Sequence, residues 1–146
     1  MHEPRTVDCN CLVVRQAARH VTQLYDRALQ PYGLKTSQFG ILASLARRGP
    51  MAINALAAAL VMDPTTLGRN LRPLQRDGLV AIAVAPGDRR SRELRVTPKG
   101  QKLLARALPG WTQAQEEFAR SFGETRAAEF RDLLRDVVAT KFAAAE

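Results

Sequence analysis

The sequence predicts a mainly α-helical chain of the α+β class, in which amphipathic helices flank one two-stranded β-hairpin. Apolar residues recur at three- and four-residue steps through most of the 146 residues, which is the spacing of helices with one buried face. Residues 79–97 instead combine β-forming residues with a Pro-Gly pair, which indicates two strands joined by a turn. Hydrophobic residues make up 46% of the chain, enough for a folded core.

Two helices are predicted in the first third of the chain. Residues 11–30 carry an apolar stripe at helical spacing, which Pro31–Gly33 interrupts. A second helix is expected over residues 37–48, with Thr36 or Ser37 as its N-cap, and the following Gly-Pro pair ends it. Both helices should turn their apolar faces toward a common core.

The next segment predicts a helix-turn-helix. Residues 54–60 form a short alanine-rich helix, and a break follows. Asp63 then acts as an N-cap and Pro64 as the first helical residue, a strong helix start. This second helix should run to about Asp77, where Gly78 closes it. Two short helices with a tight turn between them have the arrangement of a helix-turn-helix.

Pro73 lies inside the second of these helices. Its ring clashes with the carbonyl group of Arg69 and removes one hydrogen bond, at a cost of roughly 3 kcal/mol in an isolated helix. We therefore expect a kink at Pro73, or a loosened last turn.

A basic hairpin follows directly. Residues 79–85 and 93–97 are predicted strands on either side of a turn at Pro86-Gly87. Four arginines lie between Pro86 and Thr97: Arg89, Arg90, Arg92 and Arg95. A hairpin in this position is the wing of a winged helix-turn-helix, so the predicted fold class is a winged helix-turn-helix with a two-stranded β-wing.

Two further helices complete the prediction. Thr97 and Pro98 repeat the pattern of a cap followed by a first helical proline, and a long helix should reach about Phe122, bent near Pro109-Gly110. A last helix is expected over residues 124–142. Its apolar face would consist of Phe130, Leu133, Leu134, Val137, Val138 and Phe142.

The excess positive charge is concentrated in one window. The formal net charge is +8, and residues 69–106 alone carry ten basic and three acidic side chains. A localised basic surface on a helix-turn-helix and its wing is typical of proteins that bind a polyanion, so double-stranded DNA is the expected partner. The alternative for the helix face is a solvated charged surface, and for the wing a hairpin whose charges protect an edge strand.

Each candidate DNA contact has a chemical reason. Arginine pairs with guanine and asparagine with adenine in the major groove, so Arg69, Asn70 and Arg72 are predicted to contact base edges, with Arg76 on the same helix. Hydroxyls at a helix N-terminus bind phosphate, which suits Thr65 and Thr66. Arginines favour a narrow minor groove. This predicts that Arg89, Arg90 and Arg92 enter the minor groove, with Asp88 pairing with Arg90 or Arg92 to orient them.

Two cysteines near the first helix permit two interpretations. Cys9 and Cys11 are either buried small apolar groups or reactive thiols, because Cys11 begins a helix whose dipole could lower its pKa. A small acidic ligand could instead be held near Arg15, Arg19 or His20. The Cys-x-Cys spacing does not fit a zinc site, so no metal is expected.

The sequence gives little support for an enzyme, a membrane protein or a secreted protein. The chain has no catalytic motif such as HExxH, GxSxG or a glycine-rich phosphate loop, so we expect neither an enzyme nor a cofactor. No apolar run approaches the length of a membrane span, and the N-terminus does not have the pattern of a signal peptide. The expectation is a cytoplasmic protein without membrane contact.

The order of these elements resembles the MarR family of bacterial transcriptional regulators. The resemblance covers residues 11–142 and rests on "GLKTSQFGILASLARRGPMAINALAAALVMDPTTLGRNLRPLQRDGLV" followed by "GDRRSRELRVTPKG". The second stretch has the spacing of the family's wing signature, with Asp88, Arg89, Arg90, Thr97 and Gly100 at the matching positions.

The resemblance implies an organisation and a function. Residues 1–10 would be an N-terminal arm, residues 11–34 and 107–146 dimerisation helices, and residues 35–106 the DNA-binding region of a single domain spanning 11–142. The chain would be a homodimeric repressor on a pseudo-palindromic operator, with half-sites ~34 Å apart. A small aromatic or carboxylate effector would release the DNA.

Two alternatives stay open at this point. One is a redox-sensing regulator of the same fold that uses Cys9 or Cys11. The other, from a different class, is a protein-interaction winged helix whose basic wing docks an acidic partner without specific DNA binding.

Overall fold

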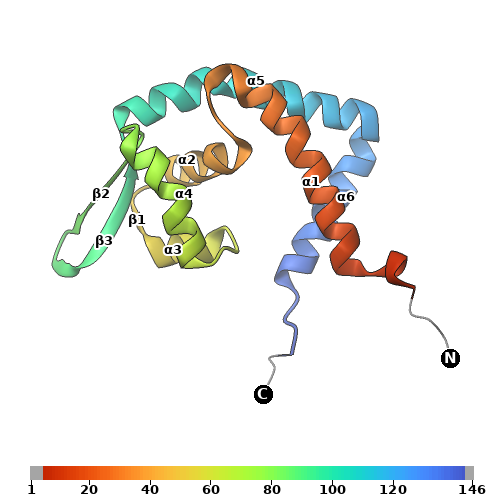
Figure 1. Cartoon of the computed structure of the whole chain (residues 1–146), viewed down its shortest axis with the longest axis horizontal. Coiled ribbons are helices and arrows are strands. Elements are labelled where there is room, and N and C mark those ends of the chain that lie inside the picture. The colour runs from red at the N-terminus through yellow and green to blue at the C-terminus, as the bar shows by residue number, and fades with distance from the viewer. Residues whose placement is uncertain (1–4, 144–146) are drawn as a thin grey trace.

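The computed structural model describes residues 5–143, which form six α-helices and a small three-stranded sheet at one end of the molecule (Figure 1). In chain order the elements are α1 (Asn10–Leu29), α2 (Thr36–Arg48), β1 (Met51–Ala52), α3 (Ile53–Ala59), α4 (Pro64–Arg76), β2 (Val80–Ala85), β3 (Asp88–Val96), α5 (Pro98–Phe122) and α6 (Glu124–Ala139). Short 3-10 turns at Thr6–Asp8 and Gln30–Tyr32 flank α1. The mainly helical winged helix-turn-helix class is confirmed.

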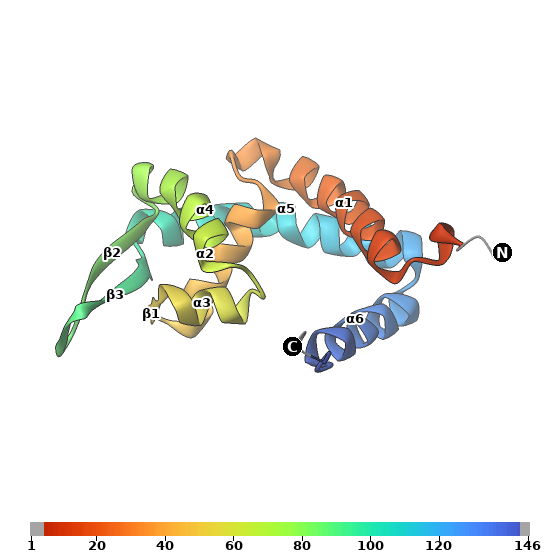
Figure 2. The same ribbon diagram turned by 60° about the horizontal axis from the view of Figure 1, so that its bottom comes forward.

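The long helix α5 connects the two ends of the molecule (Figure 1). Helices α2, α3 and α4 and the sheet gather at one end, and α1 and α6 lie at the other (Figures 1 and 2). Helix α5 contacts α2 and β3 at the first end and α1 and α6 at the second. A rotation of α5 would therefore displace elements at both ends of the molecule.

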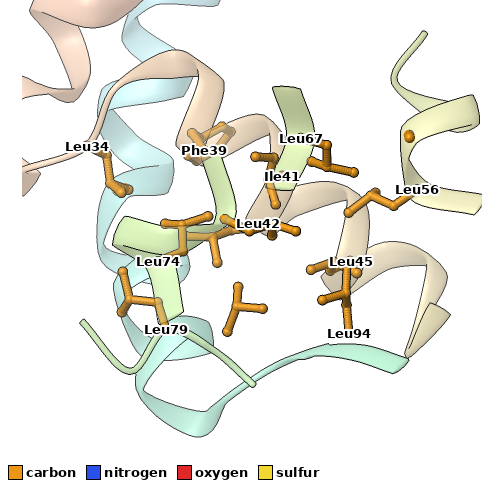
Figure 3. Close-up of a cluster of buried hydrophobic side chains, with 14 of the residues drawn as sticks. Leu34, Phe39, Ile41, Leu42, Leu45, Leu56, Leu67, Leu74, Leu79 and Leu94 are labelled. Carbon is orange, nitrogen blue, oxygen red and sulfur yellow. The ribbon is translucent and has the colours of Figure 1, made fainter. Parts of the chain in front are cut away.

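The main core lies beneath the helix-turn-helix. Leucines from α2, α3, α4 and β3 meet there, and Leu42, Leu56 and Leu67 have no exposed surface (Figure 3). Burying one such side chain stabilises the fold by about 1.5–3 kcal/mol. The other large members of this core are Leu29, Leu34, Phe39, Ile41, Leu45, Leu71, Leu74, Leu79, Val80 and Leu94. The apolar stripes of the sequence are thus its buried faces.

The sheet has the strand order β1-β3-β2, and both pairs are antiparallel. Strands β2 and β3 form the predicted wing, with Ile82 opposite Leu94. The two-residue strand β1, in which Met51 pairs with Leu94, was not predicted. Two residues are too few to show a period-two pattern, so the sequence carried no signal for this strand.

Two of the three predicted helix caps are confirmed. The carboxylate of Asp63 accepts the N–H of Thr66 at 3.1 Å, and the Thr97 hydroxyl accepts the N–H of Gly100 at 3.0 Å. The prediction for α2 was wrong. Thr36 is the first residue of that helix, and its N–H donates to Asp26 of α1 at 2.7 Å. The side chain of Asp26 therefore shares the capping with that of Gln38, which accepts the N–H of the N-cap residue Lys35 at 2.9 Å.

Both prolines inside helices are accommodated without ending them. Helix α4 continues through Pro73 to Arg76, and the carbonyl of Pro73 accepts the N–H of Asp77 at 3.0 Å. The next N–H, from Gly78, reaches back three residues to Gln75, which tightens the last turn. Leu71 and Leu74, each 1% exposed, hold this turn against the core and offset the cost of the proline. Helix α5 likewise continues through its proline.

The last helix is shorter than predicted. Helix α6 ends at Ala139, so Phe142 lies beyond it and does not belong to its apolar face. A corner at Gly123, with φ of +105°, joins α5 to α6. There the guanidinium of Arg126 lies 4.1 Å from the ring centroid of Phe122. Phe118 and Phe130 stack with ring centroids 6.0 Å apart, which fixes α6 against α5.

Candidate DNA interface and sensing sites

Helix α4 presents one face to the core and the opposite face to solvent. Leu67, Leu71 and Leu74 are buried against α2, α3 and β2. Thr65, Arg69, Arg72 and Arg76 recur at three- and four-residue steps on the exposed side. Most of the predicted base and phosphate contacts therefore share one accessible surface, as a helix in a major groove requires.

A depression of about 460 Å³ lies in this face, between α4 and the wing. Gly68 and Gln75 of α4 belong to it, although neither was among the predicted contacts. The helical repeat that selected Thr65 and Arg72 could have found them. The lining residues are Ile53, Thr65, Gly68, Arg69, Leu71, Arg72, Gln75 and Ile82.

Asn70 and Thr66 lie to one side of this surface. Asn70 is half-buried, and its side-chain nitrogen lies 3.9 Å from the sulfur of Met62 in the helix-turn-helix turn. The Thr66 hydroxyl is 3.5 Å from the capping carboxylate of Asp63. Arg76, at the other end of α4, pairs with its neighbour Asp77 at 3.4 Å. These three side chains are less free to meet DNA than Arg69 and Arg72.

The arginine side chains at the wing tip form no ion pairs with the described part of the chain. Arg89, Arg90 and Arg92 are exposed, and none pairs with a carboxylate anywhere in residues 5–143. Arg92 instead donates to the carbonyl of Arg89 at 3.4 Å. Arg95, lower on β3, pairs with Glu93 at 2.9 Å. The tip therefore offers three exposed guanidinium groups that form no ion pair within residues 5–143.

Asp88 orients the tip by a route different from the predicted one. Its carboxylate accepts the backbone N–H of Arg90 at 2.9 Å and the Ser91 hydroxyl at 2.8 Å, and it makes no ion pair with Arg90 or Arg92. These hydrogen bonds, that from Arg90 first, hold the pKa of Asp88 below its ordinary value. Asp88 thus shapes the backbone that carries the arginines.

Both cysteines are exposed free thiols, which contradicts the interpretation of buried apolar groups. Helix α1 begins at Asn10, so Cys9, not Cys11, is the N-cap, and its sulfur accepts the N–H of Leu12 at 3.4 Å. Cys11 lies in the first turn. Both thiols are therefore open to oxidants in solution. Residues 1–4 of the predicted N-terminal arm lie outside the described residues.

Of the three residues predicted as alternative neighbours of an acidic ligand, Arg15, Arg19 and His20, one lines a pocket. Arg15 and Arg19 are exposed on α1, and only His20 lines a pocket, of about 320 Å³, between α1 and α5. The pocket also contains Arg27 and Glu117 beside an apolar wall. Its remaining lining residues are Val21, Gln23, Leu24, Phe118, Ser121 and Phe122.

A second pocket, of about 460 Å³, lies between α1, α2 and α5 and was not predicted. Phe39 and Trp111 stack in it with ring centroids 6.2 Å apart, and the Tyr25 hydroxyl donates to the side-chain carbonyl of Gln115. Burial raises the pKa of Tyr25, and the positive charge of Arg131 opposes this shift. Its other lining residues are Val21, Thr22, Thr36, Gly40, Ala43 and Ser44, so no charged side chain faces it.

Neither a metal site nor a membrane segment is found in the described part of the chain. Within residues 5–143 no three His, Cys, Asp or Glu side chains lie close enough together to hold a metal ion. Over the same residues no helix has both the length and the apolar character needed to cross a bilayer.

Comparison with known proteins also indicates a protein that binds DNA. Residues 32–91 match the model of the MarR family. The regulator PecS of Dickeya dadantii, described as an HTH-type transcriptional regulator, is 31% identical over 91% of this chain and 84% of its own length. The M. tuberculosis transcriptional regulator MosR, solved in complex with DNA, is 35% identical with a TM-score of 0.78, over 92% of this chain and all of that one.

A third comparison is structural. BpsR of Bordetella bronchiseptica, a structure described as explaining how 6-hydroxynicotinic acid regulates its DNA binding, superposes with a TM-score of 0.84 over 96% of this chain and all of its own. At 19% identity this likeness shows the fold alone. PecS and MosR are each more than 30% identical to this chain, and the exposed face of α4 and the wing are basic. These findings establish that this chain is a DNA-binding transcriptional regulator of the MarR family.

Proposed function

We propose that the chain is a homodimeric repressor that binds a pseudo-palindromic operator through α4 and the wing. One observation carries the proposal: α4, with its exposed basic face, contacts β2 of the hairpin whose other strand, β3, carries the exposed arginines of the wing tip. Such a surface fits a major groove and the neighbouring minor groove at once. Arg69 and Arg72 would contact bases, Thr65 phosphate, and Arg89, Arg90 and Arg92 the minor groove.

The experiment that tests this function is duplex binding at two salt concentrations. The duplexes are the region upstream of the protein's own gene and a scrambled control. Tight binding to the former alone, falling steeply with salt, supports a specific regulator that releases several counterions. Equal weak binding to both duplexes contradicts the proposal that the protein recognises an operator sequence. It favours the alternative that the chain is a winged helix that binds an acidic protein partner.

Dimerisation is supported by apolar surface that the single chain leaves open. Val138 of α6 is 64% exposed and Leu133 is 65% exposed, although both lie on the helix's apolar stripe. Further exposed apolar residues of α1 and α6 are Leu12, Val13, Val14, Leu134 and Val137. Apolar surface of this extent marks an interaction site. A second copy of the chain would bury this apolar surface. The resulting dimer would place one α4 helix at each half-site of the operator.

An effector fits best between α1, α2 and α5. This pocket joins helices of the proposed dimer to α2 of the DNA-binding region, so a ligand there would act on the placement of α4. Its stacked aromatic rings, hydroxyl and amide groups, with no charged side chain, favour an uncharged aromatic or phenolic ligand. A carboxylate would instead suit the His20 pocket, where Arg27 offers a positive charge.

Trp111 makes these two sites distinguishable. It is the chain's single tryptophan and lies in the α1–α2–α5 pocket, so ligand there should quench its fluorescence directly. We expect phenol to quench it more than benzoate does, and the Tyr25→Phe variant to weaken phenol binding. Benzoate binding that calorimetry detects, that leaves Trp111 fluorescence unquenched and that the Arg27→Gln variant loses, would place the effector in the His20 pocket.

Redox sensing is the second candidate, because both thiols are exposed. Peroxide would oxidise Cys9 and Cys11 to a disulfide and be reduced to two waters. Cys9 is the N-cap of α1 and its sulfur accepts the N–H of Leu12, whereas Cys11 lies in the first turn, so this bond would require that hydrogen bond to break and the first turn of α1 to rearrange. Peroxide should then abolish DNA binding by the parent protein and spare the Cys9→Ser/Cys11→Ser variant. Loss of binding by both proteins would exclude these thiols as the sensor.

A further inference from the structure

We propose that the depression above Gly68 accepts the methyl group of a thymine in the operator, so that Gly68 determines which base pair α4 tolerates there. The inference rests on the proposed binding of α4 in the major groove. It goes beyond that function by assigning base selectivity to a residue with no side chain.

Glycine inside a helix is costly and needs a reason. It destabilises a helix interior by up to about 1 kcal/mol relative to alanine. In α5 the reason is internal packing. A Cβ on Gly100 would lie 2.8 Å from Val96, and one on Gly110 would lie 2.6 Å from the carbonyl oxygen of Ala28. Both positions are closed to any side chain.

Gly68 has no such internal reason. A Cβ built on it meets no atom within 4 Å, apart from its own helix and chain neighbours, and its backbone is not in the left-handed region. The folded chain would therefore accept alanine at residue 68 and become more stable. Gly40 inside α2 is equally open to a Cβ, but Gly68 lies on the face of α4 that would meet DNA, so we assign the benefit of its glycine to a molecule that approaches this face from outside.

The surroundings of Gly68 identify that molecule. Thr65 lies three residues before it and Arg72 four residues after it, so both flank the gap on the same face. With Arg69 and Gln75 they form a polar rim, while Ile53, Leu71 and Ile82 supply apolar surface. The thymine methyl is the apolar group that bases present in the major groove, and it suits a small apolar recess ringed by hydrogen-bonding groups.

The first test compares Gly68→Ala with the parent protein on the tightest duplex that the parent selects from random-sequence DNA. We expect the midpoint of thermal unfolding to rise by roughly 4 °C. Affinity for the selected duplex should fall at least about fivefold, because the new methyl occupies the position next to the α4 backbone that the thymine methyl would take. The control is Ala105→Gly, an exposed position of α5, which should lower the midpoint and leave DNA affinity within twofold.

The second test replaces each thymine of the selected duplex by deoxyuridine, which removes only the methyl group. The parent protein should lose about fourfold in affinity at one position per half-site, the value of one buried methyl. Gly68→Ala should lose nothing further there, because the contact is already gone.

The outcomes separate the two proposals. If the parent protein selects no sequence, the operator function fails and this inference fails with it. If the parent protein selects a sequence but Gly68→Ala binds it equally well, only the role of Gly68 is overturned. If Gly68→Ala binds weakly but no deoxyuridine weakens the parent protein, the recess receives sugar-phosphate backbone and the thymine assignment is wrong.

Discussion

The hydroxyl of Thr97 donates a 2.6 Å hydrogen bond to the carbonyl of Gly78 while it caps α5 through the N–H of Gly100. The end of α4 is thereby joined to the beginning of α5 beneath the wing. Lys99 adds a bond from its ammonium group to the carbonyl of Asp77 at 2.8 Å. The helix that meets DNA is thus fixed to the long helix that reaches the other end of the molecule.

Thr97→Ala should therefore lower the free energy of unfolding. It removes a helix cap and leaves the carbonyl of Gly78 without its donor, so we expect a loss of about 1–2 kcal/mol in urea denaturation. Thr97→Ser keeps the hydroxyl and should recover most of that loss. If serine were as destabilising as alanine, the methyl group rather than the hydrogen bonds of Thr97 would be what matters.

Arg90→Ala should weaken operator binding by ~1–3 kcal/mol, because an uncompensated charge of the wing tip is lost. The slope of log affinity against log salt should also become less steep by about one unit. Fluorescence anisotropy with a labelled duplex at several salt concentrations measures both quantities. Arg120→Ala, the same change in charge on α5, is the control. Affinity within error of the parent protein would remove Arg90 from the interface.

The pKa of Asp88 should respond to its hydrogen bonds. The pKa of Asp88 is lower in the folded protein than in the unfolded chain, where it is about 4. The ionised carboxylate therefore stabilises the fold above about pH 4, and this stabilisation is lost as the pH falls through the pKa of the folded state. Ser91→Ala removes one donor and should raise the pKa of Asp88 toward its ordinary value. Carboxyl NMR titration of both proteins measures the shift. An unchanged midpoint would mean that Ser91 does not bind the carboxylate in solution.

Leu134→Asp and Val138→Asp should each dissociate the proposed dimer, because a charge would enter its apolar interface. Val138→Asp is the cleaner of the two, since Val138 is 64% exposed in the chain against 36% for Leu134. Sedimentation equilibrium would report the change in mass. Val84→Asp, at a 51% exposed apolar position of β2, should leave the dimer intact. Dimers of both α6 variants would exclude this helix from the interface.

Local chemistry explains what could be predicted about the elements. Asp63 and Thr97 each cap a helix through a hydrogen bond that spans three residues, so adjacent letters of the sequence contain the whole interaction. Gly78, with φ of +73°, ends α4 for a reason equally local. The leucines of α4 recur at helical spacing, and this is why its exposed basic face could be predicted.

The features that the sequence did not predict depend on residues far away in the chain or on segments too short to show a pattern. The N-terminus of α2 is bonded by Asp26 from another helix, and β1 exists only because Leu94 of β3 pairs with it. Asp88 bonds a backbone N–H where opposite charges suggested an ion pair, since the turn brings the amide of Arg90 closer than its guanidinium. Arg15 and Arg19 do not line the α1–α5 pocket that His20 lines, because side chains one and five positions apart on a helix point in different directions.

The sequence by itself determined the starts of α4 and α5, the glycine that ends α4, the basic exposed face of α4 and the wing, because each depends on hydrogen bonds or periodicity within a few residues. Only the tertiary structure decided which pockets exist, which thiols are exposed and which glycines are required by packing. Gly100 and Gly68 are the same letter inside two helices. A Cβ on the first would collide with Val96, whereas one on the second would meet open space, and that difference arises only when distant segments come together.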